Sequence, residues 1–281
     1  MRQRILMFVY MLPVLMIVSA PQCQAGAATG EGGKAACCWQ DGADIALMLK
    51  NADQLYSQFR PADAAAELVK VLQLDPRSFE AHVKLSRAHI DIGDMIPESA
   101  QNWQERRMKE YRVAENYARE AIKIDPNSTW GYFYVAASLG NLAMLSPVAK
   151  QIEMAQDIRL SVERSIALDP QNGFAYHVYG VWHRKMAEIG KMSRVLASVF
   201  YGQSLPHGTI AKSIEYLKKS VDLNPTVIVS RLELARSYVA AQNWQSARNF
   251  LRSIRDLPIQ FSDDAKHKQK AQQLLEEIKE H

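Results

Sequence analysis

Histidine spacing is the first feature of this sequence that bears on chemistry, because paired histidines can bind a metal ion. His82 and His89 stand seven residues apart, and His177 and His183 stand six apart. On a helix that rises ~1.5 Å per residue, the first pair lies ~10 Å apart along the axis and the second pair points to different faces. Neither spacing suits joint ligation, so we expect no metal site and no cofactor.

Short catalytic motifs are missing as well. The chain has no G-x-S-x-G, no H-E-x-x-H, no glycine-rich phosphate loop and no C-x-x-C. It also shows no cluster of acidic residues or histidines whose pKa values would be shifted as they are in active sites. We therefore predict that the protein is not an enzyme.

Two adjacent cysteines, Cys37 and Cys38, lie in a stretch rich in glycine and alanine. In an oxidising compartment they could form a strained disulfide ring or pair with another chain. The alternative is a flexible segment whose cysteines have no essential role. A metal site would need further ligands at suitable spacing, and none stands nearby.

A recurring pattern predicts the elements that position the remaining polar residues. Leu-Asp-Pro or a close variant closes a helical run at 74–76, 124–126, 168–170 and 223–225. Such self-similarity is typical of stacked-repeat proteins, whose units bury their apolar faces against one another. A small or β-branched residue stands five positions before each proline: Val71, Ala121, Ser165 and Ser220.

The helical periodicity predicts five helical hairpins and no β-sheet. A last helix at about 263–280 is polar except for one apolar stripe, which suits a cap on the final hairpin. The expected hairpin helices lie at about 45–59 with 61–75, 78–92 with 103–124, and within 128–168, 173–223 and 226–257.

The fifth unit matches the tetratricopeptide (TPR) class, whose repeat is ~34 residues of helix–turn–helix. Pro225 and Pro258 are 33 residues apart. Between them, the large, small and aromatic residues expected of the class are Leu234, Ala235, Tyr238, Ala247 and Leu251. We therefore predict an all-α, TPR-like α-solenoid of about five hairpins with a C-terminal capping helix.

The earlier units are longer, because their closing prolines stand 50, 44 and 55 residues apart. We expect inserts between the two helices of each unit, at about 94–109, 143–152 and 188–208. Insertions in a solenoid map to one face, which is often the binding face. The third insert is apolar, and we expect it to form an additional helix on the concave side.

Several of these features together resemble a known family. They are the Trp-containing helix after Asp125-Pro126, the segment 165–170, Gly180-Val-Trp182, the insert that closes at Leu205-Pro206, and the stretch from Ala211 through Pro225 that leads to Tyr238. Over residues 130–251 the chain is similar to the TPR-like region of the regulator of microtubule dynamics family. Members in animal cells are associated with microtubules, mitochondria and the endoplasmic reticulum. The resemblance implies a helical binding scaffold without enzymatic activity.

In the TPR class the first helix of each hairpin lines a concave groove. Aromatic residues there can hold an apolar side chain, and arginines can pair with an anionic group. We expect an extended peptide, or an acidic or amphipathic small molecule, to bind through Arg87, Arg184 and Arg236. The alternative is that the aromatics are core residues and the arginines pair with neighbouring acids. The expected groove residues are Val83, Arg87, Trp130, Phe133, Tyr134, Phe174, His177, Arg184, Leu232 and Arg236.

The N-terminal segment predicts export. Arg2 and Arg4 precede an apolar run of about 14 residues, and Ala25-Gly26-Ala27 offers a cleavage site. The run is shorter than the ~20 residues of a spanning helix, and an uncleaved membrane anchor is the alternative. An exported protein does not meet microtubules, so we do not carry that role over. The expected domains are a signal peptide at 1–27, a flexible linker at 28–43 and the repeat domain at 44–281.

Charge places limits on the partner. The chain has 34 Lys and Arg against 30 Asp and Glu, with the signs mixed along its length. Nucleic acid and membrane surfaces are therefore not expected partners. We predict a periplasmic or secreted scaffold that holds a partner protein or peptide in its concave groove. The alternative is a periplasmic carrier of a small ligand, which an enclosed apolar cavity would favour.

Overall fold

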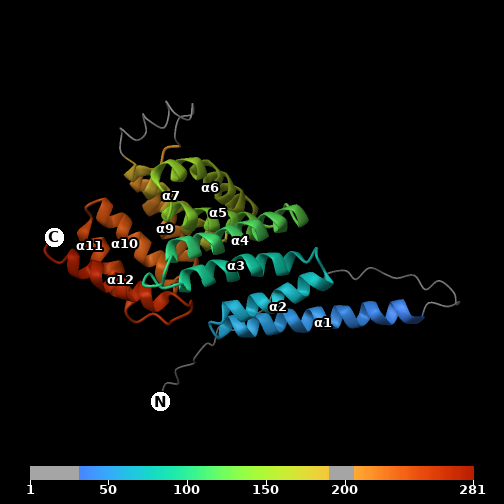
Figure 1. Ribbon diagram of the computed structural model, residues 1–281. Coiled ribbons are helices and arrows are strands. Elements are labelled where there is room, and N and C mark those ends of the chain that lie inside the picture. The colour runs from blue at the N-terminus through green and yellow to red at the C-terminus, as the bar shows by residue number, and fades with distance from the viewer. Residues whose placement is uncertain (1–31, 190–205) are drawn as a thin grey trace, which may run out of the picture. The chain divides into compact units, whose positions relative to one another are not determined.

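The computed structural model describes residues 32–189 and 206–281, with side chains from Gly42 onward (Figure 1). Regular structure in these ranges is entirely helical, and residues 41–281 form one compact unit. The helices are α1 (Gly32–Ser57), α2 (Pro61–Leu74), α3 (Phe79–Met95), α4 (Trp103–Ile124), α5 (Thr129–Met144), α6 (Val148–Leu168), α7 (Gly173–Glu188), α9 (Ile210–Leu223), α10 (Ile228–Ala240), α11 (Trp244–Ile254) and α12 (Asp264–Glu277).

The order of packing confirms the predicted solenoid. Each helix from α2 to α7 contacts the next one along the chain, as do the helices from α9 to α12, and α7 contacts α9. The first helices of successive hairpins also contact one another. Helix α5 contacts both α3 and α7, and α7 contacts α10. Helices α3, α5, α7 and α10 therefore make one layer, and their hairpin partners α4, α6, α9 and α11 make the other. We call the exposed side of the first layer the inner face.

The aspartate of the recurring tripeptide forms the turn between hairpins. Asp75 ends α2: its backbone N–H donates to the Val71 carbonyl at 2.7 Å, and its Oδ1 accepts from the Arg77 N–H at 3.0 Å. The Ser78 hydroxyl then accepts from the Ala81 N–H and caps α3. The same aspartate bond recurs from Asn127 to Asp125 and from Gln171 to Asp169, each at 2.9 Å. One residue type thus closes each helix and shapes the turn that follows.

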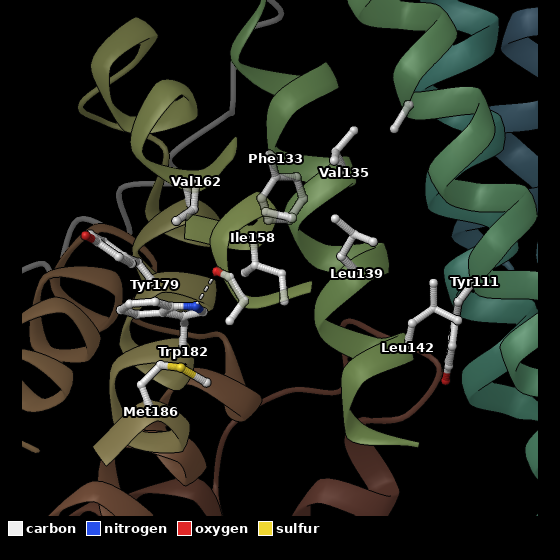
Figure 2. Close-up of a cluster of buried hydrophobic side chains, with 14 residues drawn as sticks. Tyr111, Phe133, Val135, Leu139, Leu142, Ile158, Val162, Tyr179, Trp182 and Met186 are labelled. Atoms are coloured by element: carbon white, nitrogen blue, oxygen red, sulfur yellow. Dashed lines mark hydrogen bonds between the residues drawn. The ribbon is translucent and has the colours of Figure 1, made fainter. Parts of the chain in front are cut away.

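Small buried residues set the spacing between helices. The four that stand five positions before the prolines are all buried. Most buried hydroxyls are paired, as in the bond from Ser86 Oγ to the Ala114 carbonyl at 2.8 Å, and Ser138 is an exception. In the largest core cluster, the Trp182 indole N–H donates to the Ala155 carbonyl at 2.9 Å (Figure 2). The core therefore contains few buried polar groups without partners, which is the normal condition of a stable interior.

Two of the expected inserts mainly lengthen helices. Residues 94–109 contain a short turn followed by the start of α4, which has 22 residues, and 143–152 contain the start of α6, which has 21. The third insert, 188–208, was predicted to be an additional helix, and its residues 190–205 lie outside the described part. The predicted linker at 28–43 is helical from Gly32 onward, in line with the high helix propensity of its alanines.

The C-terminal helix does more than cap the last hairpin. Helix α12 packs on α10 and α11, as the prediction required (Figure 1). In addition, Lys266 Nζ lies 3.4 Å from Glu98 Oε1, in the turn between α3 and α4. The Phe261 ring meets the Phe174 ring of α7 at 6.1 Å between centroids. Residues 261–266, which we call the C-terminal strap, therefore cross the inner face from the fifth hairpin to the second.

Close approach of α7 to α9 makes Gly180 a sensitive position. A Cβ built there would lie 2.5 Å from Leu217 Cγ and 3.1 Å from both Leu217 N and Ser213 O. We expect Gly180→Ala to lower the free energy of unfolding by about 1–3 kcal/mol, since backbone atoms cannot move aside cheaply. Gly140→Ala is the matched control, because no packed neighbour lies within 4 Å of the position that its Cβ would take. Urea denaturation of both variants tests this, and equal stability would contradict it.

None of the helices in residues 32–189 and 206–281 has both the length and the apolar character that a membrane crossing requires.

Candidate binding site on the inner face

Two adjoining cavities open on the inner face. The Trp182 cavity lies among α5, α6 and α7, has a volume of about 220 Å³ and is walled mainly by apolar groups such as Met144, Ile158 and Trp182. The Trp130 cavity lies among α3, α5, α7 and the C-terminal strap, and its volume is about 280 Å³. Four residues line both cavities: Phe133, Ala137, Phe174 and Val229.

Aromatic rings form a continuous wall in the Trp130 cavity. Trp130 meets Phe133 edge-on at 5.8 Å between centroids and stacks with Tyr134 at 6.2 Å. Phe133 in turn lies 6.1 Å from Phe174, which meets Phe261 of the strap. Trp130, Phe133 and Tyr134 come together because positions i, i+3 and i+4 share one face of a helix. Side chains from three separate segments thus meet around one space.

Six of the ten predicted groove residues line the cavities. They are Arg87, Trp130, Phe133, Tyr134, Phe174 and His177. Val83 is half-buried on α3 and lines neither cavity. Leu232 is a correction: it is completely buried in the cluster that joins α10 to α11 and α12. Helical spacing puts Leu232 beside Val229 and Arg236, but it stands at the edge of that face, where residues of α11 and α12 cover it.

Arg184 and Arg236 do not offer free charges to a ligand. Both guanidinium groups bind the carboxylate of Glu233, and Arg184 also donates to Glu188 at 3.1 Å. Arg184 and Glu233 are buried, with 5% and 8% of their surfaces exposed. Burial raises the pKa of Glu233, but the two arginine charges outweigh this and hold the pKa below its usual value. This arrangement is the alternative stated above, in which the arginines pair with neighbouring acids.

The other polar residues predicted for the groove are also engaged. The Arg87 guanidinium lies over the Tyr56 ring, 3.7 Å from its centroid. His177 Nδ1 lies 3.1 Å from the Ser230 hydroxyl. Burial lowers the pKa of His177 to about 4, so this side chain is neutral at pH 7. His177 therefore contributes a hydrogen-bonding ring and no charge.

Carboxyl groups that the sequence does not single out also line the Trp130 cavity, beside the predicted Arg87. Asp91, Asp94 and Asp263 all line it. Burial, together with the charges of Asp94 and Asp263, raises the pKa of Asp91 to about 8. Burial also raises the pKa of Asp94 to about 6, although the Tyr111 hydroxyl donates to its Oδ1 at 2.6 Å. The cavity is thus acidic at one end, whereas the sequence analysis expected arginine-based binding of anions.

One group of side chains has the composition of a metal site. Asp263, Asp264 and His267 each offer a ligand atom, and these atoms lie within 4.8 Å of one another. Asp264 has a structural role, because its Oδ2 accepts the backbone N–H groups of Gln260 and Phe261 at 2.8 and 2.9 Å. These bonds hold the turn that places the strap on the inner face. Cys37 and Cys38 are in α1, but their side chains lie outside the described residues, as does the predicted signal peptide.

Comparison with known proteins identifies relatives of this chain. A family model described as "Regulator of microtubule dynamics protein 1-3" matches residues 48–279. Regulator of microtubule dynamics protein 1 of Bos taurus is 24% identical over 235 residues, which cover 83% of this chain and 71% of that protein. The Homo sapiens protein of the same name is 24% identical over 198 residues, covering 70% of this chain and 62% of its own length.

Solved structures support the fold. A thermophilic TPR protein of Thermus thermophilus superposes with a TM-score of 0.58 at 14% sequence identity. The superposition covers 82% of this chain and 99% of that chain. At this level of identity the likeness concerns the arrangement of helices, so the fold is that of TPR proteins.

Proposed function

Because the chain belongs to the regulator of microtubule dynamics protein 1-3 family, we propose that it is a non-enzymatic interaction module. Its inner face binds a short apolar segment of a partner protein or peptide. TPR-like solenoids present a rigid curved surface to their partners. The observation that carries the proposal is the pair of adjoining apolar cavities, which share four lining residues and open on that surface.

Cavity size favours side chains of a partner. Pockets for drug-sized ligands are ~300–1,000 Å³, and the two cavities are about 220 and 280 Å³. Each is therefore suited to one or two apolar side chains that project from a neighbouring chain. Buried aromatic or aliphatic anchors of this kind supply most of the energy in protein interfaces.

The C-terminal strap limits the length of the bound segment. Phe261 packs on Phe174 and Lys266 pairs with Glu98, so the strap occupies the inner face between the second and fifth hairpins. A long extended peptide could not run along the whole face without displacing it. The bound segment is therefore shorter than the extended peptide that the sequence predicts.

Carriage of a small amphipathic molecule is the second candidate function. It is favoured by the four residues that line both cavities, because the combined space reaches the size range of small-ligand pockets. An apolar chain would then extend from one cavity into the other. The strap and the aromatic wall would shield it from water.

Filling the shared space tests both candidates. Ala137 is half-buried and lines both cavities, so Ala137→Phe should block them. Ala66→Phe on the exposed face of α2 is the matched control. We expect affinity capture followed by mass spectrometry to recover a partner with the wild type and the control, and at least tenfold less with Ala137→Phe. Equal recovery with both variants would contradict the proposal. Organic extraction of the purified protein separates the candidates, since only a carrier releases a bound small molecule.

We also propose that the protein is exported, which would place its partner outside the cytosol. The support is the basic start, the apolar run at 5–18 and the cleavage site at 25–27. Mass spectrometry of the protein from envelope and external fractions should find a chain that begins near residue 28. An intact N-terminus in the cytosolic fraction would contradict export.

A further inference from the structure

We propose that the Trp130 cavity binds an alkylammonium group, carried either by a lysine side chain of the partner or by a small amine. The inference rests on the proposed function, because it assigns a chemistry to one of the two cavities. Two observations carry it: the aromatic wall, and the Asp91 carboxyl group, which faces the cavity without a hydrogen bond or ion pair to any of the described residues.

The aromatic wall can hold a cation. Cations are attracted to the faces of Trp, Tyr and Phe rings within ~6 Å, most strongly where water is excluded. The cavity already shows this contact at its edge, where the Arg87 guanidinium lies over the Tyr56 ring. The rings of Trp130, Tyr134 and Phe261 line the rest of the cavity, and among the described residues no cation lies over them.

Asp91 lacks a partner for its carboxyl group. Among the residues that the structure describes, no side chain forms a hydrogen bond or ion pair with it. Asp94 accepts a bond from Tyr111, and Asp263 lies 3.4 Å from His267 Nε2. Burial lowers the pKa of His267, although the charge of Asp263 acts in the opposite direction. Asp91 is half-buried, and a carboxylate that loses water without gaining a partner is stabilised by protonation or by a cation.

The neighbouring cations are committed to other groups. Lys266 pairs with Glu98 at 3.4 Å. Arg107 donates from Nε to the Ile96 carbonyl at 2.9 Å and lies 3.8 Å from Glu98. The charges of Arg107 and Lys266 still act on Asp94, so Asp91 is the carboxyl group that is left for a cation supplied by the ligand.

The alkyl part of the ligand has a place as well. The lining shared with the Trp182 cavity leads away from the carboxyl groups into an apolar space. A ligand with a cationic head and a short apolar tail would match both ends. An anionic head would place like charges beside Asp91 and Asp263, which raises its free energy of binding.

Three probes with the same alkyl chain test the charge preference. They are octyltrimethylammonium, octanoate and octanol, each titrated by isothermal calorimetry into the full chain below its micelle-forming concentration. We expect octyltrimethylammonium to bind at least tenfold more tightly than either other probe. Asp91→Asn should remove most of this preference and leave octanol binding unchanged. Asp222→Asn, on the exposed side of α9, is the control for a general loss of negative charge.

The pH dependence gives a second readout. A cation stabilises the ionised carboxylates, so its affinity should rise between pH 6 and pH 8, where Asp94 and Asp91 ionise. Two other groups face Asp91: Arg87, and Tyr134, which stays neutral over this range because burial raises its pKa to about 12. Three charged or titratable groups from other elements also act on the Asp91 or Asp94 carboxyl group. They are Arg107 of α4, Asp263 of the C-terminal strap and Lys266 of α12. Asp91→Asn should flatten the upper part of this rise.

The outcomes separate this inference from the proposed function. If all three probes bind equally and Ala137→Phe abolishes binding, the proposed binding in the apolar cavities is supported and the cation preference is wrong. If the wild type binds no probe, the inference is also wrong, and partner capture alone decides the proposed function. Titration with two peptides identifies the source of the alkylammonium group. They are acetyl-Leu-Lys-Leu-amide and its analogue with norleucine in place of lysine. A preference for the lysine peptide supports a partner side chain, and octyltrimethylammonium binding without that preference supports a small amine.

Discussion

The Glu233→Gln variant should unfold with a free energy about 3–5 kcal/mol lower than the wild type, the cost of breaking a buried ion pair. Glu233 is the shared partner of Arg184 and Arg236, and Arg184 is buried. The amide has the same shape as the carboxylate but no charge. The substitution therefore leaves the Arg184 guanidinium in the interior without a full counter-charge, and only Glu188 remains bonded to it.

Urea denaturation at pH 7 measures this effect, with Glu215→Gln as the matched control. Glu215 pairs with Lys212 at 2.9 Å, but both side chains are about half exposed. Exposed pairs of this kind contribute less than about 1 kcal/mol. If Glu233→Gln cost no more than the control, the buried network would have no special role in stability.

Replacing the whole pair distinguishes charge burial from packing. The double variant Arg184→Met with Glu233→Leu removes both buried charges and keeps apolar volume. Such replacements are commonly neutral or stabilising, so most of the loss seen with Glu233→Gln should be recovered. A double variant as unstable as the single one would show that shape, not charge, is decisive there.

The helical repeat could be predicted from sequence because its signals are local. Asp75 closes a helix and bonds within two residues, and the same chemistry recurs at Asp125 and Asp169. The buried small residues, such as Ala121, follow from helical periodicity over a single turn. Neither feature depends on contacts between distant parts of the chain.

The aromatic part of the site was predictable for the same reason. Trp130, Phe133 and Tyr134 follow one another on one face of α5, and register alone brings them together. Register was not enough on α10, because Leu232 shares a helix face with Arg236 and is nevertheless buried against α11 and α12. Which edge of a face is covered depends on the helices that pack there, and these lie further along the chain.

The acidic end of the cavity could not be predicted, because it depends on a long-range return of the chain. Phe261 and Asp263 come back to α7 and α3 from the last turn of the solenoid. No local pattern around the strap indicates where it packs. The pairing of Arg184 with Glu233, 49 positions apart in sequence, has the same origin.

Stability should fall with rising pH between about 6.5 and 8, and Asp91 is the reason. Its pKa is raised from 3.8 to about 8 in the folded protein. Across that interval the folded state holds a proton that the unfolded state has released, so stability decreases as pH rises. The burial of His177 and His183 lowers both pKa values from 6.5 to about 4, which acts in the opposite direction but only below pH 6.5.

The expected loss for the wild type is about 2 kcal/mol over this interval, since one pKa unit corresponds to ~1.4 kcal/mol. Asp91→Asn cannot ionise, so its stability should stay level from pH 6.5 to 8, whereas Asp222→Asn should follow the wild type. Urea denaturation at four pH values measures the slopes, and parallel slopes for wild type and Asp91→Asn would contradict the assignment. A saturating alkylammonium probe should flatten the wild-type slope as well, because a bound cation supplies the counter-charge that the ionised Asp91 lacks.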